Sequence, residues 1–383
     1  MKKNLKEIKL KKIANIVLND FTNDSRVWKT SDSLNKMGFK TEVVALHRLG
    51  LKEIEIKEGV SVKRIKILTL KLPKLRFAKY IKFFEFSLIA IWQYRNYDFI
   101  HCNDLQALPI GLAIRLFSKK KVKVIYDSHE YQTERKNIKG FEKFLVKFLE
   151  RSLIRFPDSV ITVSESIANE YTRLYKIPKP QLVLNCPSYV KQKKYDFFRE
   201  KFSIDLRQSI FLYQGGLSPG RDIEVLIDVF SQYKDDENII IFMGYGPLEG
   251  MIKDLSKKSK NIFFHPSVDL NVLLSYTGSA DYGISLVDDT CLNHEYCLPN
   301  KIFEYLNAGI PIITSNRFEM KKLIQQTGIG VTTSNNSKDE LRKSINLIKE
   351  MDYKVLQKNI KNASKIYNWE EQEKVLKKVY TNV

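Results

Sequence analysis

The chain has 383 residues, of which 43% are hydrophobic and 11% aromatic, enough apolar material for two ordinary domain cores. Four cysteines in so long a chain exclude a disulfide framework and indicate a reducing compartment. The net charge of +20 is concentrated in residues 1–190, which carry +18, whereas residues 191–383 carry +2, so the front half is expected to meet an anionic partner.

The first half alternates strand and helix signals, as in a doubly wound sheet. Residues 1–12 are basic but lead into a buried strand over residues 13–18 and not into an apolar signal core, so we expect a cytoplasmic protein. A polar loop precedes a helix over residues 26–37, which stops at Gly38, and a strand follows over residues 41–46. Ligands of such sheets bind at the carboxyl ends of the strands, and this loop lacks the glycines of a nicotinamide site.

A basic and aromatic segment spans residues 59–84 and contains no acidic residue. Its cations are Lys63, Arg64, Lys66, Lys71, Lys74, Arg76, Lys79 and Lys82, and Phe77, Tyr80, Ile81, Phe83, Phe84 and Phe86 lie among or just after them. Bulky apolar groups beside cations favour an anionic membrane surface over a nucleic acid or a solvated helix face. The apolar run from Phe83 to Trp92 is too short to cross a bilayer.

Two later strands end in polar residues. One ends at Asp104, before an apolar helix over residues 105–117, and the next covers residues 122–126. The sequence Asp127-Ser-His-Glu130 follows directly, so a histidine flanked by carboxylates stands at the carboxyl end of a buried strand. This position favours a functional role for His129 over a structural one.

The segment 140–156 has helical periodicity. Phe141, Phe144, Leu145 and Phe148 lie on one side, and Lys139, Lys143, Lys147, Arg151 and Arg155 recur every four residues. This segment is a second membrane-facing candidate, and a surface helix packed through its phenylalanines is the alternative. Residues 191–207 are charged and lack periodicity, so we expect them to form an interdomain linker.

The second half restarts the alternation with a glycine-rich loop. A strand over residues 209–214 runs into Gly215-Gly-Leu-Ser-Pro-Gly220, and a helix begins near Arg221. Glycines let the backbone approach a phosphate closely, and a helix N-terminus beside an arginine attracts an anion. A loop of this kind between a strand and a helix predicts a phosphate site.

A later helix carries a second set of polar groups. Pro299 and Asn300 open it, Lys301 and Glu304 lie on one face, and the helix ends at Gly309. An ammonium, a carboxylate and free backbone N–H groups within one turn suit a ribose hydroxyl beside a phosphate. Cys291, His294 and Cys297 lie nearby, but three potential ligands without a fourth are a weak zinc signal, and we expect no metal.

These stretches resemble retaining glycosyltransferase family 4. In the second half, Leu298–Pro311 is similar to the family's donor-site signature, Tyr213–Glu224 is similar to its pyrophosphate loop, and Gly244–Glu249 is similar to the turn that follows the next strand. In the first half, Tyr126–Glu130 is similar to the family's strand-end motif, and Asp24–Val27 is similar to a short motif near its start. The resemblance implies an α/β protein of GT-B fold, in which two Rossmann-like doubly wound domains face a cleft. The expected parts are an acceptor domain (1–190), a linker (191–207), a nucleotide-sugar domain (208–365) and a helix returning to the first domain (366–383).

The resemblance also implies roles for individual residues. Glu304 would hold the donor ribose, His129 would lie against the donor sugar, and Arg221 with Lys301 would stabilise the departing diphosphate. The expected catalytic residues are thus His129, Arg221 and Lys301. The expected donor contacts are Gly215, Gly216, Arg221, Gly246, Val268, Glu295, Tyr296, Pro299, Asn300, Lys301 and Glu304, and the expected acceptor contacts are Asn23, Asp24, Arg26 and Asp104.

The sequence departs from the family pattern twice. Many members have an arginine after the first loop glycine, where this chain has Gly216, so charge neutralisation is expected to rest on Arg221 and Lys301. The family's first glutamate, counted back from Glu304, falls on Tyr296, and Glu295 is one residue away. Either the loop shifts so that Glu295 serves, or Tyr296 and the backbone hold the sugar.

The sequence therefore predicts a retaining glycosyltransferase that moves a hexose-type sugar from a nucleotide diphosphate sugar to a glycan or lipid-linked acceptor. We expect no cofactor, no metal and no nucleic acid partner. The basic, aromatic segments predict peripheral association with the anionic inner face of the cell membrane. A nucleotide-sugar epimerase of the same fold, and a catalytically silent membrane-associated scaffold, are the alternatives.

Overall fold

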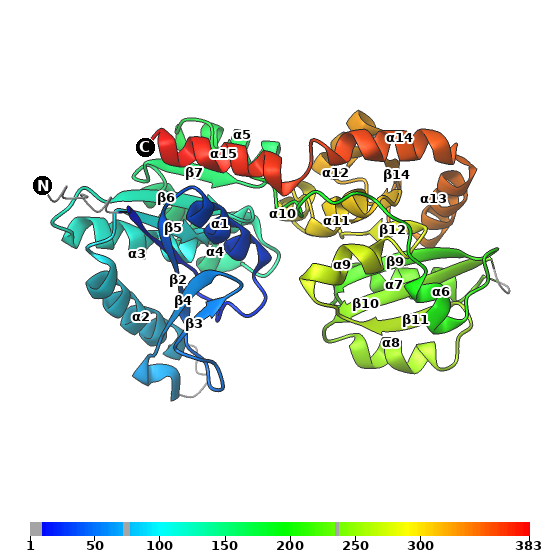
Figure 1. Ribbon diagram of the computed structural model, residues 1–383, viewed down its shortest axis with the longest axis horizontal. Helices are drawn as coiled ribbons and strands as arrows, with labels where there is room; N and C mark the ends of the chain where they lie inside the picture. The colour runs from blue at the N-terminus through cyan, green and yellow to red at the C-terminus, as the bar shows by residue number, and fades with distance from the viewer. Residues whose placement is uncertain (1–9, 72–76, 234–236) are drawn as a thin grey trace, which may run out of the picture. The chain divides into compact units, whose positions relative to one another are not determined.

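A computed structural model of the chain describes residues 10–71, 77–233 and 237–383. These residues form two compact units, each built on its own sheet with helices packed against it (Figure 1). Unit 1 extends to Val183 and includes Glu373–Val383, and unit 2 is Leu184–Gln372. The start of the basic N-terminal segment, and Lys74 and Arg76 of the basic, aromatic segment, lie outside the described residues.

The sheet of unit 1 has eight strands in the order β3-β4-β2-β1-β5-β6-β7-β8. The strands are β1 (Lys12–Ile16), β2 (Lys40–Leu46), β3 (Ile54–Lys57), β4 (Val60–Ile65), β5 (Phe99–Asn103), β6 (Lys123–Ser128), β7 (Ser159–Thr162) and β8 (Gln181–Leu182). Strand β3 runs antiparallel to β4, and the other pairs are parallel. The doubly wound arrangement therefore brings the carboxyl ends of β5 and β6 together, where Asn103 is in register with Asp127.

The helices of unit 1 lie between these strands in the chain. They are α1 (Ser25–Lys36), α2 (Ala78–Tyr94), α3 (Asp104–Phe117), α4 (Gly140–Leu153) and α5 (Glu165–Tyr175), with 3-10 turns at Leu68–Lys71 and Gln132–Glu134. The C-terminal helix α15 (Trp369–Thr381) ends in unit 1, where the ring of Tyr380 packs against Phe39 and Phe99. Among the described residues, no helix is long and apolar enough to cross a membrane.

The hairpin of β3 and β4 was not predicted and corrects part of the membrane prediction. Val60 and Val62 are buried and alternate with polar residues, which is the period of a strand. Arg64 is buried too, pairs with Glu55 at 2.8 Å and donates to the Asp20 carbonyl, so it belongs to the fold and not to a surface segment. The basic, aromatic surface begins only beyond this hairpin.

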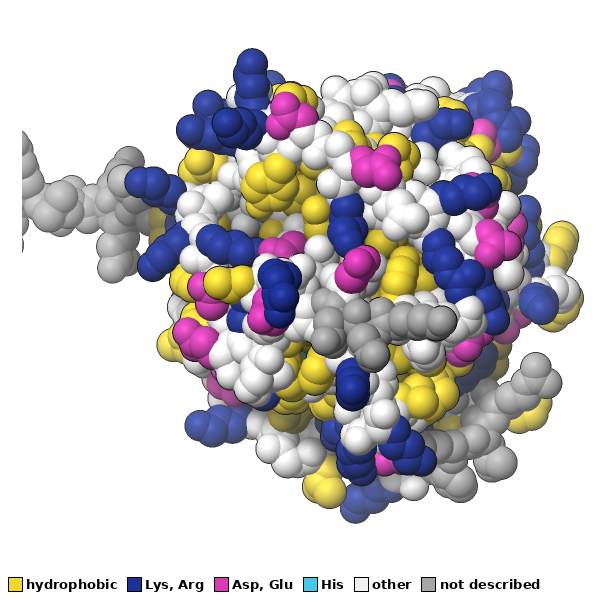
Figure 2. All heavy atoms as spheres, turned by 90° about the vertical axis from the view of Figure 1, so that its right-hand side faces the viewer, with side chains coloured by type: hydrophobic (Ala, Val, Ile, Leu, Met, Phe, Trp, Pro, Cys, Tyr) yellow, Lys and Arg dark blue, Asp and Glu magenta, His cyan; other side chains and the backbone are white. Residues whose placement is uncertain are grey.

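Unit 2 has a parallel sheet of six strands in the order β11-β10-β9-β12-β13-β14. The strands are β9 (Ser209–Gly216), β10 (Asn238–Tyr245), β11 (Ile262–Pro266), β12 (Tyr282–Ser285), β13 (Ile312–Thr314) and β14 (Gly330–Thr332). The helices are α6 (Phe197–Phe202), α7 (Ile223–Phe230), α8 (Glu249–Ser256), α9 (Leu270–Thr277), α10 (Leu292–Glu295), α11 (Asn300–Ala308), α12 (Phe318–Thr327), α13 (Lys338–Glu350) and α14 (Tyr353–Ser364). Basic and acidic side chains alternate over the face of this unit shown in Figure 2, in line with the low net charge of this half.

Residues 191–207 do not form the expected linker. They include α6, whose Phe198 is fully buried in the core of unit 2. Arg199 and Lys194 both pair with Asp281, at 2.7 and 2.8 Å, and so fasten the segment to the sheet. The division between the units instead falls after Val183.

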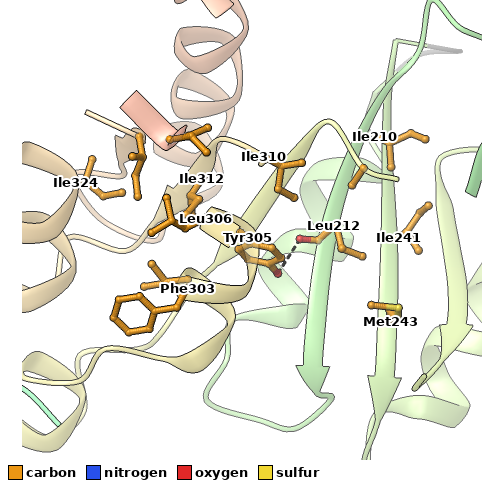
Figure 3. Packing of buried hydrophobic residues seen from close by; sticks show 14 of the residues in the cluster. Ile210, Leu212, Ile241, Met243, Phe303, Tyr305, Leu306, Ile310, Ile312 and Ile324 are labelled. Carbon is orange, nitrogen blue, oxygen red and sulfur yellow. Dashed lines mark hydrogen bonds between the residues drawn. The ribbon is translucent and has the colours of Figure 1, made fainter. Parts of the chain in front are cut away.

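Helix α11 is fastened to the sheet of unit 2 by one tyrosine (Figure 3). The buried Tyr305 hydroxyl lies 3.0 Å from the Leu212 carbonyl and 3.1 Å from the Ile284 carbonyl, and it accepts the Gln214 N–H. A Cβ on Gly283 would lie 2.4 Å from the Tyr305 ring, so only glycine admits the ring there. This contact fixes where the first turn of α11 is presented.

Candidate active site

In unit 1, the carboxylate of Asp127 at the end of β6 is the centre of a buried polar cluster. Arg26 of α1 donates to both carboxylate oxygens, from Nε at 3.0 Å and Nη2 at 2.7 Å, and also to the Val183 carbonyl. Burial alone would raise the pKa of Asp127, but the charges of Arg26 and His129 hold it well below its usual range. Arg26 is thus a buried partner of Asp127, and its predicted contact with an acceptor is wrong.

His129 lies between two carboxylates. Its Nδ1 is 3.8 Å from Asp104 Oδ2, and its Nε2 is 3.5 Å from Asp127 Oδ2. Burial lowers the pKa of His129, but the two carboxylates outweigh it and leave this pKa above its ordinary value. The raised pKa favours the protonated imidazole, and 19% of the His129 side chain is exposed to a ligand.

Asp104 holds His129 from the neighbouring strand end. It is the first residue of α3 and has a φ of +59°, a strained conformation for a residue with a side chain. Its Oδ1 accepts the His129 backbone N–H at 3.1 Å and the Gln132 amide at 2.6 Å. The structure therefore brings together Asp104 and His129, which the sequence assigned separately to the acceptor and the donor sugar.

The other two predicted acceptor residues lie in the loop before α1. Asp24 is the N-cap of this helix, since its Oδ1 accepts the Val27 N–H, and its Oδ2 accepts the Asn19 amide. Asn23 is exposed beside it. The carboxylate of Asp24 therefore has a structural role that its position in the sequence did not indicate.

In unit 2, the predicted loop glycines and Lys301 come together. Gly215 has a φ of +108°, and a Cβ there would lie 3.9 Å from Lys301 Nζ. The same ammonium lies 3.6 Å from the centre of the Tyr213 ring. Gly246 stands behind the loop, where a Cβ would be 2.4 Å from the Leu217 carbonyl, so it supports the loop by close packing.

The positive charges at this loop have no close ion-pair partners among the described residues. Burial, together with the neighbouring charge of Arg221, lowers the pKa of Lys301 well below its ordinary value. Among residues 10–71, 77–233 and 237–383, neither Lys301 nor Arg221 has an ion-pair partner within 4 Å. Two adjacent cations beside a glycine loop form an anion site.

Glu304 is held one turn along α11 from Lys301. Its Oε2 accepts the Gln214 amide at 2.5 Å, and Gln214 in turn accepts the Thr277 hydroxyl at 2.7 Å. Pro299 is the N-cap of this helix and Asn300 its first residue, and no side chain caps the first turn. The N-terminus of α11 thus presents backbone N–H groups beside Lys301, as predicted.

The two candidates for the missing family glutamate lie at the end of α10 and contact the start of α12. Glu295 accepts the Phe318 N–H at 2.9 Å and pairs with Arg317 at 3.3 Å, so it acts as a cap for that helix. The Tyr296 ring packs edge-on against Phe318. Val268 follows β11 and packs partly against the core of unit 2.

Sequence reasoning missed several members of these clusters. Asp127 lies in the motif that contains His129, but nothing local indicates its role, and His101, Gln214 and Tyr380 have no local signal. His101 is followed by a polar strand end, but it is fully buried within β5. Tyr380 lies 279 positions from the histidine that it contacts, and no spacing rule links such residues.

Two family descriptions match the chain. Residues 25–186 match "Glycosyltransferase Family 4", and residues 228–371 match "Glucosyltransferase 3-like, C-terminal domain". Among curated proteins, the chain is 25% identical over 381 residues to the chitobiosyldiphosphodolichol beta-mannosyltransferase of Candida albicans, covering 90% of this chain and 81% of that protein. The protein of the same name from Debaryomyces hansenii is 25% identical over 334 residues, covering 77% of this chain and 68% of its own length.

Solved structures share the fold. The sucrose-phosphate synthase from Thermosynechococcus elongatus superposes with a TM-score of 0.79 at 16% identity, covering 97% of this chain and 98% of that one. Anabaena HepE, solved in complex with UDP and glucose, gives a TM-score of 0.74 at 13% identity, covering 97% of this chain and 100% of that one. The predicted GT-B fold is confirmed.

The ion pair of Asp127 and Arg26 predicts an acid-sensitive unit 1. Since the folded pKa of Asp127 is depressed, its contribution to stability is present above its unfolded pKa and is lost as the pH falls below about 4. Asp127→Asn leaves the Arg26 charge buried without its partner, and we expect it to lower the free energy of unfolding at pH 7 by about 3–5 kcal/mol. Urea unfolding of both proteins from pH 7 to pH 3 measures the difference.

The matched control is Asp158→Asn, which removes a more exposed carboxylate that pairs with Lys123 at 2.8 Å and Arg115 at 3.4 Å. We expect a cost below about 1 kcal/mol. Equal losses in the two variants, or a difference that does not shrink in acid, would contradict the assignment.

Proposed function

We propose, from the premise that this chain belongs to glycosyltransferase family 4, that it transfers a sugar from a nucleotide diphosphate sugar to a lipid-linked or glycan acceptor at a membrane surface. The chain is a glycosyltransferase, as its sequence predicts. The observation that carries the proposal is the anion site of unit 2, where the cations Lys301 and Arg221 lie beside a glycine loop and the uncapped N-terminus of α11.

The donor would bind through its diphosphate. The ammonium of Lys301, the guanidinium of Arg221 and the N–H groups of the first turn of α11 would hold the phosphate oxygens, and Glu304 would accept from a ribose hydroxyl. When the sugar leaves, negative charge grows on the departing diphosphate, and the same fixed cations stabilise it. UDP is the proposed nucleotide, because HepE of the same fold was solved with UDP.

His129 would act on the donor sugar or on the departing phosphate. As a cation held between Asp104 and Asp127, it can donate a hydrogen bond from a fixed position. This role needs the protonated form, which the raised pKa of His129 favours near neutral pH. We propose that no metal is needed, since protein cations supply the positive charge at the diphosphate.

The acceptor is proposed to be lipid-linked. The relatives from Candida albicans and Debaryomyces hansenii are named for transfer of a mannosyl group to chitobiosyldiphosphodolichol, a sugar carried on a lipid diphosphate. An acceptor anchored in a bilayer requires that the enzyme approach the membrane. A cytoplasmic protein bound peripherally to the inner face of the membrane would meet this requirement.

The stereochemistry has two candidate outcomes. The family resemblance implies retention at the anomeric carbon, whereas the relatives are named beta-mannosyltransferases, and a β product from an α-linked donor requires inversion. Inversion needs a base for the acceptor hydroxyl, and Asp104 is a carboxylate with 38% of its side chain exposed. The one-bond carbon–proton coupling constant at the product's anomeric carbon decides between the two mechanisms.

The membrane surface is proposed to be the outer side of α2 and α4. Phe84 and Trp92 on α2 are 64% and 65% exposed, and Phe144 and Phe148 on α4 are 62% and 63% exposed. Helix α3 contacts both helices, and its end adds an exposed Phe117. The alternative of a helix packed through its phenylalanines does not hold for α4, because those rings face solvent.

Cations surround this apolar surface. Lys139 and Arg151 are exposed on or next to α4, and Lys71 is exposed before α2. Lys143 and Lys147 are less available than predicted, because both pair with Glu134, at 2.5 and 2.7 Å. Large exposed aromatic groups beside cations are suited to an anionic bilayer.

Loss of the cations at the anion site is expected to abolish transfer. Arg221→Ala removes one of the two charges that stabilise the departing diphosphate, so we expect kcat to fall by about 100-fold or more. Glu304→Gln is expected to raise KM for the donor by about tenfold, because it weakens an acceptor of the ribose hydroxyl. The measurement is UDP release and product formation with UDP-sugars and lipid-linked acceptors, with and without a metal chelator.

Arg342→Ala is the control, since Arg342 lies on α13 and pairs with Asp339 in the same unit. This variant should leave both kcat and the KM for the donor unchanged. Sugar conversion without an acceptor would support the epimerase alternative, and nucleotide binding without any turnover would support the scaffold. Loss of activity with the chelator would refute metal independence.

Binding of UDP is expected to take up a proton. In the free protein, burial and the neighbouring Arg221 hold the pKa of Lys301 well below its ordinary value, and a bound diphosphate, which stabilises the charged form, would raise this pKa. The affinity for UDP should therefore fall as the pH rises above the pKa that Lys301 has in the free protein. Calorimetry in two buffers of different ionisation enthalpy measures the proton count.

Lys301→Met should remove both the proton uptake and most of the affinity. Lys253→Met is the matched control, because Lys253 is an exposed lysine that pairs with Glu249 in unit 2. A pH-independent affinity, or equal effects of the two variants, would speak against an ammonium at the diphosphate.

Membrane binding is expected to depend on the aromatic rings of α2 and α4. Replacing Phe84, Trp92, Phe144 and Phe148 with serine removes four groups, each of which contributes about 1.5–3 kcal/mol when buried in an apolar phase. We expect the fraction bound to vesicles containing anionic lipid to fall by at least tenfold in a flotation assay. Phe318→Ser with Leu347→Ser removes exposed apolar residues of unit 2 as a control and should have no effect. Unchanged flotation of the four-residue variant would refute the proposed surface.

A further inference from the structure

A buried chain of polar contacts connects the C-terminal helix with His129. The Tyr380 hydroxyl on α15 lies 2.8 Å from His101 Nδ1, and His101 Nε2 on β5 lies 3.3 Å from Asp127 Oδ2. The same carboxylate oxygen lies 3.5 Å from His129 Nε2. Tyr380, His101 and Asp127 are all buried, and only His129 at the end of the chain of contacts is partly exposed.

The direction of each hydrogen bond follows from the charges. Asp127 is ionised and can only accept, so His101 Nε2 must carry the proton. Burial lowers the pKa of His101 and keeps its ring neutral, which leaves Nδ1 as an acceptor. The Tyr380 hydroxyl is therefore the donor to Nδ1. Each hydrogen bond in the chain points from α15 toward Asp127.

We propose that Tyr380 and His101 are positioning residues of the transfer reaction, which hold the Asp127 carboxylate and through it set the orientation and charge of the His129 imidazole. The inference rests on the proposed function only in giving His129 a role at the donor. The C-terminal helix α15 then contributes a positioning residue, Tyr380, to the site of unit 1.

Packing alone does not account for these residues. The Tyr380 ring lies against Phe39 and Phe99 at 5.6 and 5.3 Å, where a phenylalanine would fill the same space without burying a hydroxyl. Neutralising Asp127 does not require His101 either, because Arg26 already donates to both of its oxygens. A buried histidine and a buried tyrosine hydroxyl are costly, so a fully connected chain of them is expected to have a function.

Five groups set the charge state of His129. Asp104 faces it from α3, Asp127 from β6, the Arg26 guanidinium from α1 and His101 from β5, while Tyr380 acts on His101 from α15. The next residue, Glu130, pairs with Arg135 at 3.8 Å. Removing the Tyr380 hydroxyl makes His101 a weaker donor to Asp127. More negative charge then remains on Asp127 Oδ2, which raises the pKa of His129.

The test is the titration of the imidazoles by nitrogen NMR, which is practical because the chain has five histidines. In the wild-type protein, His101 should show the Nε2–H tautomer and should not titrate between pH 5 and pH 9. In Tyr380→Phe, the midpoint of His129 should rise by about 0.3 pH unit or more. Tyr94→Phe is the matched control, since it removes a buried hydroxyl that donates to Glu42 at 2.8 Å elsewhere in unit 1.

Steady-state kinetics of the same variants separate this inference from the proposed function. In Tyr380→Phe, the pH profile of kcat/KM should shift in the direction of the His129 titration, with a fall in kcat of about threefold or more and an unchanged KM for the donor. His101→Asn should produce a larger fall in kcat, and Tyr94→Phe should produce none. Thermal unfolding of all the variants reports whether a loss comes from folding.

The outcomes are distinct. A shifted His129 titration in a protein that transfers no sugar refutes the proposed function and leaves the coupling standing. Active wild-type protein with the same His129 midpoint and pH profile in Tyr380→Phe overturns the positioning role. A titrating His101, the Nδ1–H tautomer, or an equal shift in Tyr94→Phe overturns it as well.

Discussion

The half-buried Lys301 is the residue on which the donor half of this protein depends. A desolvated cation beside a second cation, Arg221, is unfavourable in the free protein, and a bound anion relieves it. The fold holds this arrangement in place from behind, because Tyr305 fastens α11 to three backbone groups and its ring occupies the space that Gly283 leaves open. The packing of unit 2 thus holds the two cations close together before a ligand binds, and the bound anion completes the site.

The two units have similar sheets but opposite electrostatics at their strand ends. In unit 1, the central charge is a carboxylate, Asp127, which is fully compensated by Arg26 and further contacted by two histidines. In unit 2, the central charges are the cations Lys301 and Arg221, which form no ion pair within 4 Å among the described residues, although the charge of Glu304 acts on Lys301. A compensated cluster is suited to hold one imidazole in a fixed state, whereas cations without a close ion pair are suited to bind a charged substrate.

The sequence predicted what local chemistry determines. The start of α11 at Asn300 and its end at Gly309 follow from residues within one helix, and the approach of Lys301 to the glycine loop follows from parallel strands ending at one edge. Long-range contacts were not predictable in this way. Arg26 resembled a loop arginine until its partner, 101 positions away, was known, and Phe198 resembled part of a linker until it was found in a core. Glu295 was considered for a sugar contact, but the N-terminus of α12 uses its carboxylate.

The exposed aromatic face of α4 is a fixed property of unit 1 and does not come from a loosely held helix. On the inner side of α4, the fully buried Glu150 accepts hydrogen bonds from three tyrosines, Tyr126 at 3.0 Å, Tyr171 at 2.9 Å and Tyr175 at 2.6 Å. Tyr126 belongs to β6, and the residue after it is Asp127. A helix with three buried hydrogen bonds on one side and bare phenylalanine rings on the other is held rigidly in an orientation that packing within unit 1 does not require. The same strand therefore anchors the apolar outer surface and carries the polar centre of the site.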